Sequence, residues 1–210
     1  MRLRSLKLVV LALALAAVMA PPASAAPITF SAPTNCPSCQ GGIYTLTYDP
    51  FSTNDALQVT LQIFTAHYNG GGTAIDAVSV KVSDKVADVD LVSAPYNTES
   101  WALIAGGINA GGCSGAGGGF ECAEWTATGV GIPVPIGGVY TWVFDIDLPL
   151  GTTPFLDGGS IKVRYVDEDG NKVGNLVSTN VTPVPEPASM LLLGTGLLGA
   201  GLWGRRRKSR

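Results

Sequence analysis

Apolar and polar residues alternate with a period of two along most of the chain between residues 26 and 184. In 57–63, aliphatic side chains recur at every second position, with Gln and Thr between them. This period is typical of a β-strand that buries one face. In 77–82 the same pattern predicts that the valines point inward and that Ser79 and Lys81 point to solvent.

Nine segments of this kind are separated by Gly, Pro, Asn and Asp, and the intervening sequence shows no persuasive helical period. They are 43–48, 57–63, 77–82, 86–92, 101–105, 123–128, 139–148, 161–166 and 172–178. Short strands with this punctuation predict an all-β domain, an antiparallel β-sandwich of about nine strands. The last two segments flank an Asp-Gly pair at 169–170, which predicts a β-hairpin.

The first 25 residues follow a different pattern. Three basic residues stand within the first seven positions, an apolar run follows over 8–20, and Ala23-Ser24-Ala25 ends the segment. This order is typical of a secretory signal peptide that is cleaved before Ala26. An uncleaved N-terminal membrane helix is the alternative, and the short apolar run disfavours it.

The last 27 residues form a third pattern. A Pro-Glu-Pro step, made of Pro185, Glu186 and Pro187, precedes an uncharged, Leu-rich stretch over 188–204 and a basic cluster over 205–208. As a helix the apolar stretch would cover roughly 25 Å, close to the ~30 Å of a bilayer's hydrocarbon core, so a transmembrane helix is predicted. The positive-inside rule keeps the basic end cytoplasmic and places the rest of the chain outside.

These three parts of the tail resemble the PEP-CTERM sorting signal of exopolysaccharide-producing Gram-negative bacteria. The resemblance implies a partner, the membrane enzyme exosortase, that acts at the Pro-Glu-Pro step while 188–204 stays transiently in the inner membrane. It also implies a final place at the cell surface or in the extracellular matrix, where exopolysaccharide is a candidate partner. An ordinary membrane anchor that is never processed is the alternative.

The chain therefore divides into a signal peptide (1–25), an exported β-sandwich domain (26–183) and a sorting signal (184–210). Eight of the 13 basic residues lie in the two ends, whereas 15 of the 16 acidic residues lie between 26 and 184. That segment keeps five basic residues and a formal charge of about −10. Such an acidic surface repels nucleic acids and anionic lipids, so nucleic-acid binding is excluded.

Four cysteines in an exported protein predict disulfides. We expect Cys113 to pair with Cys122 across a glycine-rich loop, which leaves Cys36 to pair with Cys39. A Cys-x-x-Cys pair can also be a redox centre or half of a zinc site. However, Cys36 precedes a strand instead of starting a helix, and the other two cysteines are spaced too widely for a zinc knuckle. Two structural disulfides, without metal or cofactor, are the prediction.

Catalytic motifs are missing from the sequence. The lone histidine, His67, stands at a strand end, and no nucleophile elbow, metalloprotease helix or phosphate loop occurs. The acidic turn 167–171 lacks the spacing of a calcium-binding EF-hand loop. Two pairs of Asp, in 88–90 and 145–147, are expected on a solvated strand face, although glycosidases also use two carboxylates. We expect no enzyme, and a glycan-acting enzyme remains the least favoured hypothesis.

Aromatic residues supply the main functional alternative. They would form a sugar-stacking platform on one sheet face, or they would fill the core of the sandwich. The residues concerned are Trp101, Trp125, Trp142, Tyr44, Tyr48 and Tyr96. Trp125, next to Glu124 and close to the disulfide loop, is the leading candidate for an exposed, ligand-binding aromatic. The sequence thus predicts a non-catalytic structural or adhesive protein, with a carbohydrate-binding module as the alternative.

Overall fold

The computed structural model describes residues 27–33, 35–50, 56–115, 117–135, 137–174 and 176–184. The predicted signal peptide and the sorting signal from Pro185 onward, with its membrane helix, lie outside these ranges. Within them, no helix has the length and apolar character needed to cross a bilayer.

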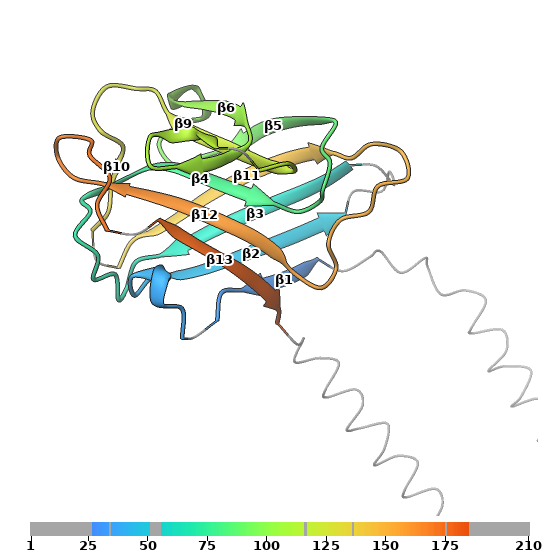
Figure 1. The fold of residues 1–210 in the computed structure, drawn as a ribbon, viewed down its shortest axis with the longest axis horizontal. Coiled ribbons are helices and arrows are strands. Elements are labelled where there is room, and N and C mark those ends of the chain that lie inside the picture. Colours follow the sequence, from blue (N-terminus) through green and yellow to red (C-terminus); the bar gives the residue numbers. More distant parts are fainter. Residues whose placement is uncertain are drawn as a thin grey trace, which may run out of the picture.

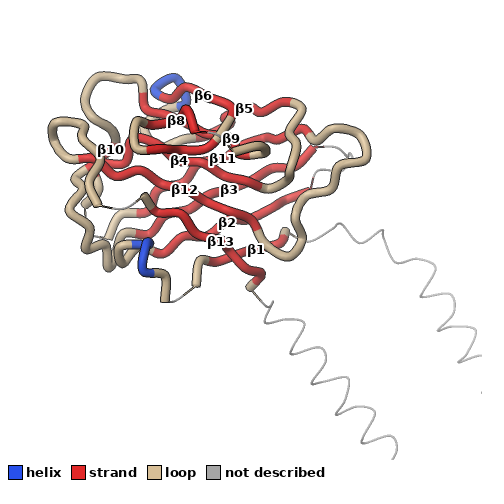
Figure 2. The backbone as a smooth tube through the Cα atoms, viewed as in Figure 1, coloured by secondary structure: helices blue, strands red, loops and turns tan. Residues whose placement is uncertain are grey.

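The described chain is all-β, with two short 3-10 turns as its helical elements (Figures 1 and 2). The strands are β1 (Ile28–Ser31), β2 (Ile43–Pro50), β3 (Ala56–Phe64), β4 (Ala74–Lys81), β5 (Asp88–Ser93), β6 (Trp101–Ala105), β7 (Gly107–Asn109), β8 (Gly112–Gly115), β9 (Phe120–Trp125), β10 (Ile132–Pro133), β11 (Val139–Asp147), β12 (Gly159–Val166) and β13 (Val177–Pro183). The 3-10 turns are η1 (Pro37–Cys39) and η2 (Thr98–Ser100).

Eleven strands form one antiparallel sheet, in the order β5-β11-β3-β2-β1-β13-β12-β4-β9-β6, with β10 paired to β4. The sheet folds over on itself, so that its two halves pack face to face and its end strands, β5 and β6, come into contact (Figure 1). The architecture is therefore a nearly closed single sheet with sandwich-like packing. β1 and β13 join the two halves that a sandwich would keep separate.

The core lies between the two halves of this sheet. The aliphatic positions that alternate in β3 and the valines of 77–82 are all fully or almost fully buried, as the period of two predicts. The largest fully buried side chains are Trp142, Tyr44, Tyr48, Tyr165, Phe30 and Phe144. Burial of these aromatic side chains is the main interaction that holds the two halves of the sheet together.

Seven of the nine predicted strands coincide closely with observed strands, and two are displaced. The segment predicted at 123–128 begins earlier, at Phe120, and the one predicted at 172–178 begins at Val177. Lys172 forms only an isolated bridge with Val166, because the chain leaves the sheet after the turn. Four further strands, β1, β7, β8 and β10, have two to four residues each, too few to show a period.

The acidic turn 167–171 closes tightly, as the Asp-Gly pair predicts. The Gly170 N–H donates to the Asp167 carbonyl at 3.1 Å, and Gly170 takes the left-handed φ of +80° that glycine allows. The Asp167 carboxylate accepts hydrogen bonds from the backbone N–H groups of Asp169 and Asn171, at 3.0 and 2.8 Å. This carboxylate therefore stabilises the turn itself.

The prediction that Ser79 faces solvent was wrong. Ser79 is fully buried, because the β7–β8 hairpin lies over the outer face of β4. Ile108 and Cys113 of that hairpin pack with Ala77 and Cys122 in a second, smaller hydrophobic cluster. A strand covered on both faces breaks the rule that alternate residues are exposed.

Both predicted disulfides are present, and no described cysteine is free. Cys36–Cys39 closes η1, and Cys39 reaches the main core. Cys113–Cys122 joins β8 to β9 and so fastens the covering hairpin to the sheet. The second bridge holds a glycine-rich segment that has few other side chains to pack.

Replacement of both cysteines, Cys113→Ser with Cys122→Ser, should release the β7–β8 hairpin. We expect the free energy of unfolding to fall by about 2–3 kcal/mol, because the unfolded chain regains the freedom of a short loop. Limited proteolysis should then cut within 107–119, and urea unfolding measures the loss of stability. The matched variant Cys36→Ser with Cys39→Ser should leave cleavage at 107–119 unchanged. Equal cleavage rates in wild type and the 113/122 variant would contradict this role.

Candidate functional site

Of the two alternatives for the aromatic residues, a sugar-stacking platform or the core, most of them belong to the core. Tyr44, Tyr48 and Trp142 are at most 1% exposed, and Trp101 is 6% exposed. Trp125, the leading candidate for an exposed aromatic, is half-buried against the core. The expectation of a solvent-facing Trp125 is therefore corrected, because β6 and the adjoining loop cover much of its ring.

Among the aromatic residues that the structure describes, the exposed one is Tyr96, with 84% of its surface accessible. It lies in the loop 94–100 between β5 and β6, and its ring makes an edge-to-face contact with that of Trp125, with 5.7 Å between centroids. Trp125 in turn meets Trp101 at 5.5 Å, and Trp101 meets Trp142 at 5.4 Å. These four rings form what we call the aromatic row, which runs by edge-to-face contacts from the core to the surface.

Tyr96 has a strained backbone in a firmly held loop. Its φ of +76° lies in the left-handed region, where a bulky side chain costs roughly 1–3 kcal/mol. The Trp101 indole N–H donates to the Pro95 carbonyl at 3.1 Å. On the other side, the Asn97 side-chain oxygen accepts from the Ser100 N–H at 2.9 Å and from its hydroxyl at 2.6 Å. The Pro-Tyr-Asn sequence between two strands is the signal that could have marked this turn.

The two predicted Asp pairs meet across neighbouring strands. Asp145 lies opposite Asp90, and Asp147 lies opposite Asp88, on the outer face of the β5–β11 pair. Gln58 donates a hydrogen bond to Asp145 at 3.0 Å. Three of these four carboxylates are exposed, in agreement with a solvated face. Among the residues that the structure covers, no His, Cys, Asp and Glu side chains gather as a metal site would require.

A buried ion pair lies beneath the covering hairpin. The Arg164 guanidinium contacts the Asp76 carboxylate at 2.5 Å, and both residues are 9% exposed. The second carboxylate oxygen of Asp76 and the Nε of Arg164 have no hydrogen-bond partner in the described part of the chain. Burial raises the pKa of the Asp76 carboxyl to about 6, against the opposing effect of Arg164, and nearby Glu124 raises it further.

His67 lies beside the Cys36–Cys39 bridge. The histidine and the cysteines are far apart in the sequence, so the sequence alone did not predict that they are neighbours. Together with neighbouring backbone they line a pocket of about 330 Å³. Both cysteines are held in the disulfide, so neither is a free thiolate in this structure. His67 is the one ionisable side chain in the lining of this pocket.

The first and last strands of the body are neighbours. Phe30 of β1 lies opposite Pro183 of β13, and the Val184 N–H donates to the Thr29 carbonyl at 2.8 Å. The start of β1 and the end of β13 therefore lie at the same end of the body (Figure 1). We call this the proximal end, and we call the opposite end, with loop 94–100 and turns 65–73 and 126–138, the distal end.

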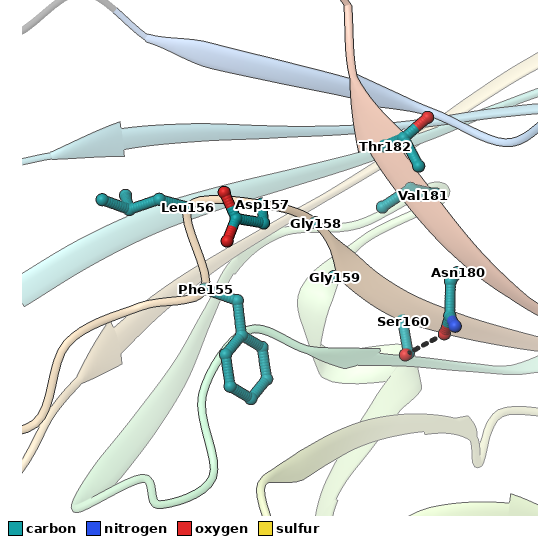
Figure 3. A pocket seen from close by; sticks show the side chains of 9 residues that line it. All are labelled: Phe155, Leu156, Asp157, Gly158, Gly159, Ser160, Asn180, Val181 and Thr182. Carbon is teal, nitrogen blue, oxygen red and sulfur yellow. Dashed lines mark hydrogen bonds between the residues drawn. The ribbon is translucent and has the colours of Figure 1, made fainter.

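An open groove of about 440 Å³ lies at the proximal end (Figure 3). Its lining comes from the segment 155–160, which leads into β12, and from 180–182 of β13. Gly158 permits the close approach, since a Cβ there would stand 2.4 Å from the Val181 carbonyl oxygen. The Ser160 hydroxyl donates to the Asn180 side-chain oxygen at 2.6 Å. Asp157 is the one ionisable residue of the lining.

Residues 183–208 match the family model described as the PEP-CTERM protein-sorting motif. This chain carries a PEP-CTERM sorting motif. The resemblance predicted from the tail is thereby confirmed, and the motif implies an exported substrate of exosortase with a C-terminal membrane anchor before sorting. No curated protein matches the chain.

Among solved structures, a chain named BspA_C_mut is similar to this PEP-CTERM protein at 14% sequence identity and a TM-score of 0.34. The match covers 73% of this chain, which spans about half, 51%, of the length of the other. At this TM-score the likeness carries no argument about fold or function.

In this PEP-CTERM protein the matched motif and the folded body meet without a spacer. The motif begins at residue 183, inside β13, and Val184 makes a hydrogen bond to β1. The next residue, Pro185, opens the Pro-Glu-Pro step. The proximal end thus stands directly at the sorting step.

The raised pKa of Asp76 should make the body more stable at pH 5 than at pH 7. The folded carboxyl holds its proton up to about pH 6, whereas the unfolded one releases it near pH 4, so this contribution is full below pH 4 and is lost as the pH rises through 6. We expect this carboxyl to raise the free energy of unfolding by about 1 kcal/mol at pH 5 relative to pH 7. The substitution Asp76→Asn should remove this contribution. Urea unfolding at both pH values measures it.

Asp84→Asn is the matched control for this experiment. It removes the same charge from an exposed carboxylate, which pairs with Lys81 at the surface. Its difference between the two pH values should equal that of the wild type. If Asp76→Asn also keeps the wild-type difference, Asp76 does not titrate in this range.

Proposed function

We propose that this PEP-CTERM protein is displayed at the cell surface or in the extracellular matrix as a non-catalytic, structural or adhesive component after sorting by exosortase. The observation that carries the proposal is the position of the sorting step. It follows the last hydrogen bond of the folded body, between Val184 and Thr29, by a single residue.

Cleavage at the Pro-Glu-Pro step would leave every strand of the body in place. β13 pairs with β1 on one side and with β12 on the other, so a cut inside it would open the sheet at the junction of its two halves. A cut at 185–187 removes the tail alone. This arrangement suits a protein whose body has to function after the tail is gone.

Attachment through the C-terminus would also orient the body. The proximal end would face the point of attachment, and the distal end would face outward. The outward end exposes an apolar row on the sheet face, in which Ile43 and Val139 flank Phe64 as cross-strand neighbours. Ile43 is 48% exposed and Val139 is 57% exposed, which supports an adhesive contact there.

The two pockets described above favour display over a glycan-acting enzyme. The proximal groove and the pocket beside Cys36–Cys39 each present a single ionisable side chain, Asp157 and His67. Hydrolysis of a glycosidic bond by the usual route requires two carboxyl groups at a fixed separation. A carbohydrate-binding module is the second candidate, with the exposed ring of Tyr96 in its favour.

The variant Glu186→Ala tests the sorting step. Wild-type protein recovered from outside its native cells should begin at Ala26, end within 185–187 and lack four thiol hydrogens, as intact mass spectrometry measures. The variant should stay in the inner-membrane fraction with its tail through Arg210, because the processing enzyme no longer meets the Pro-Glu-Pro step.

Glu168→Ala, in the exposed turn 167–171, is the matched control. It removes the same side chain without touching the tail, and it should be exported and trimmed like the wild type. Wild-type protein that keeps residues 188–210 at the cell surface would refute the sorting proposal and leave a plain membrane anchor.

A further inference from the structure

We propose that Tyr96 is the stacking platform of a binding site for neutral polysaccharide at the distal end. In this site one pyranose ring lies against the exposed face of the tyrosine ring, with Trp125 at its edge. The inference deepens the carbohydrate-binding candidate. It rests on the proposed display in one respect, because the distal end has to face outward.

The ring of Tyr96 is not explained by the stability of the body. With 84% of its surface exposed, it buries little apolar area. Its left-handed backbone is a conformation that Gly or Asn adopts at lower cost. Among the described residues, Gln40 and Tyr96 are the two that have a positive φ without being glycine. A turn needed only to connect β5 and β6 would be better served by a small residue.

The loop that carries Tyr96 is fixed before any ligand arrives. The Trp101 indole holds the carbonyl of Pro95, and Asn97 caps η2 through the Ser100 N–H. The ring itself leans on Trp125, and the aromatic row continues from there into the core. A platform held in this way loses little conformational entropy on binding, which favours weak ligands such as sugars.

The polar surroundings fit the hydroxyl groups of a sugar. Asn97, Glu99 and Thr126 are exposed. Asn97 and Thr126 follow Tyr96 and Trp125 in the sequence, and Glu99 lies in the same loop as Tyr96. Their amide, carboxylate and hydroxyl groups provide both donors and acceptors. A pyranose presents an apolar C–H face to the ring and hydroxyl groups at its rim, so both parts of the sugar find a counterpart.

The charge of the body and the size of the exposed platform indicate which class of ligand this site would bind. The five basic residues of the body are Lys81, Lys85, Lys162, Arg164 and Lys172, and none lies between residues 88 and 135. The loop 94–100 thus carries Glu99 and no basic residue, which disfavours an anionic polymer there. A protein partner requires roughly 800 Å² on each side, far more than one exposed ring and its rim supply. A neutral sugar ring matches the size of the platform.

Affinity electrophoresis of the full-length chain in a mild non-ionic detergent tests the site. The probes are three neutral polysaccharides, a β-1,4-glucan, a galactomannan and an α-1,4-glucan, and one anionic polymer, alginate. At least one neutral probe should retard the wild type, and alginate should not. Tyr96→Asn should reduce the retardation at least tenfold, and Tyr96→Phe should keep it, since stacking needs the ring and not the hydroxyl.

Leu150→Asn is the matched control, because Leu150 is 88% exposed and lies in the loop 148–158 of the proximal end. It should bind like the wild type. The melting temperature of Tyr96→Asn should equal or exceed that of the wild type, since Asn accepts the left-handed backbone. A lower melting temperature would show that the ring serves the fold and would overturn the proposal.

Three further results would overturn it: no retardation by any neutral probe, equal retardation by alginate, or unchanged retardation of Tyr96→Asn. None of these bears on the processing of the tail, which the mass of the exported protein reports. The sorting proposal and the binding proposal therefore fail separately.

Discussion

The pairing of β1 with β13 is the constraint on which the rest of the body depends. These two strands are the first and the last of the described chain, and they join the two halves of the sheet. Without this junction, the two halves of the sheet would not be held together, and the aromatic side chains between them would be covered on one side only. Because the junction is made by the first and last strands of the body, the body is complete only when Val177–Pro183 has folded. That same strand leads straight into the sorting motif.

The sequence predicted the inner face of the sheet well, because burial on one side leaves a period of two that can be counted in β3 and β11. The prediction failed for strands that are not buried on one side only. β4 is buried on both faces, so Ser79 gave no sign of the hairpin above it. Short strands such as β7 and β10 show no period at all. The disulfide pairing was predicted correctly because an oxidising compartment favours disulfides and a short glycine-rich loop favours the pairing of Cys113 with Cys122 among the three possible connectivities.

The candidate site was harder to predict because exposure is a property of packing. Six aromatic residues looked alike in the sequence, yet five of them pack in or against the core and one points to solvent. What distinguishes Tyr96 is its backbone, held between the contacts of Pro95 and Asn97. No periodicity reports such a conformation. Similarly, the pairing of Asp145 with Asp90 depends on strand order, which places β5 beside β11 in spite of the long sequence between them.

The direction of β13 has a mechanical consequence. A body anchored at its C-terminus and held at its distal end is stretched along this strand. The hydrogen bonds that β13 makes to β1 and β12 are perpendicular to the strand axis, as in any antiparallel pair. The load therefore acts in shear on all of these hydrogen bonds at once, so they do not break one after another. In the proposed display, a pull on the distal end would thus be resisted by many hydrogen bonds of β13 together.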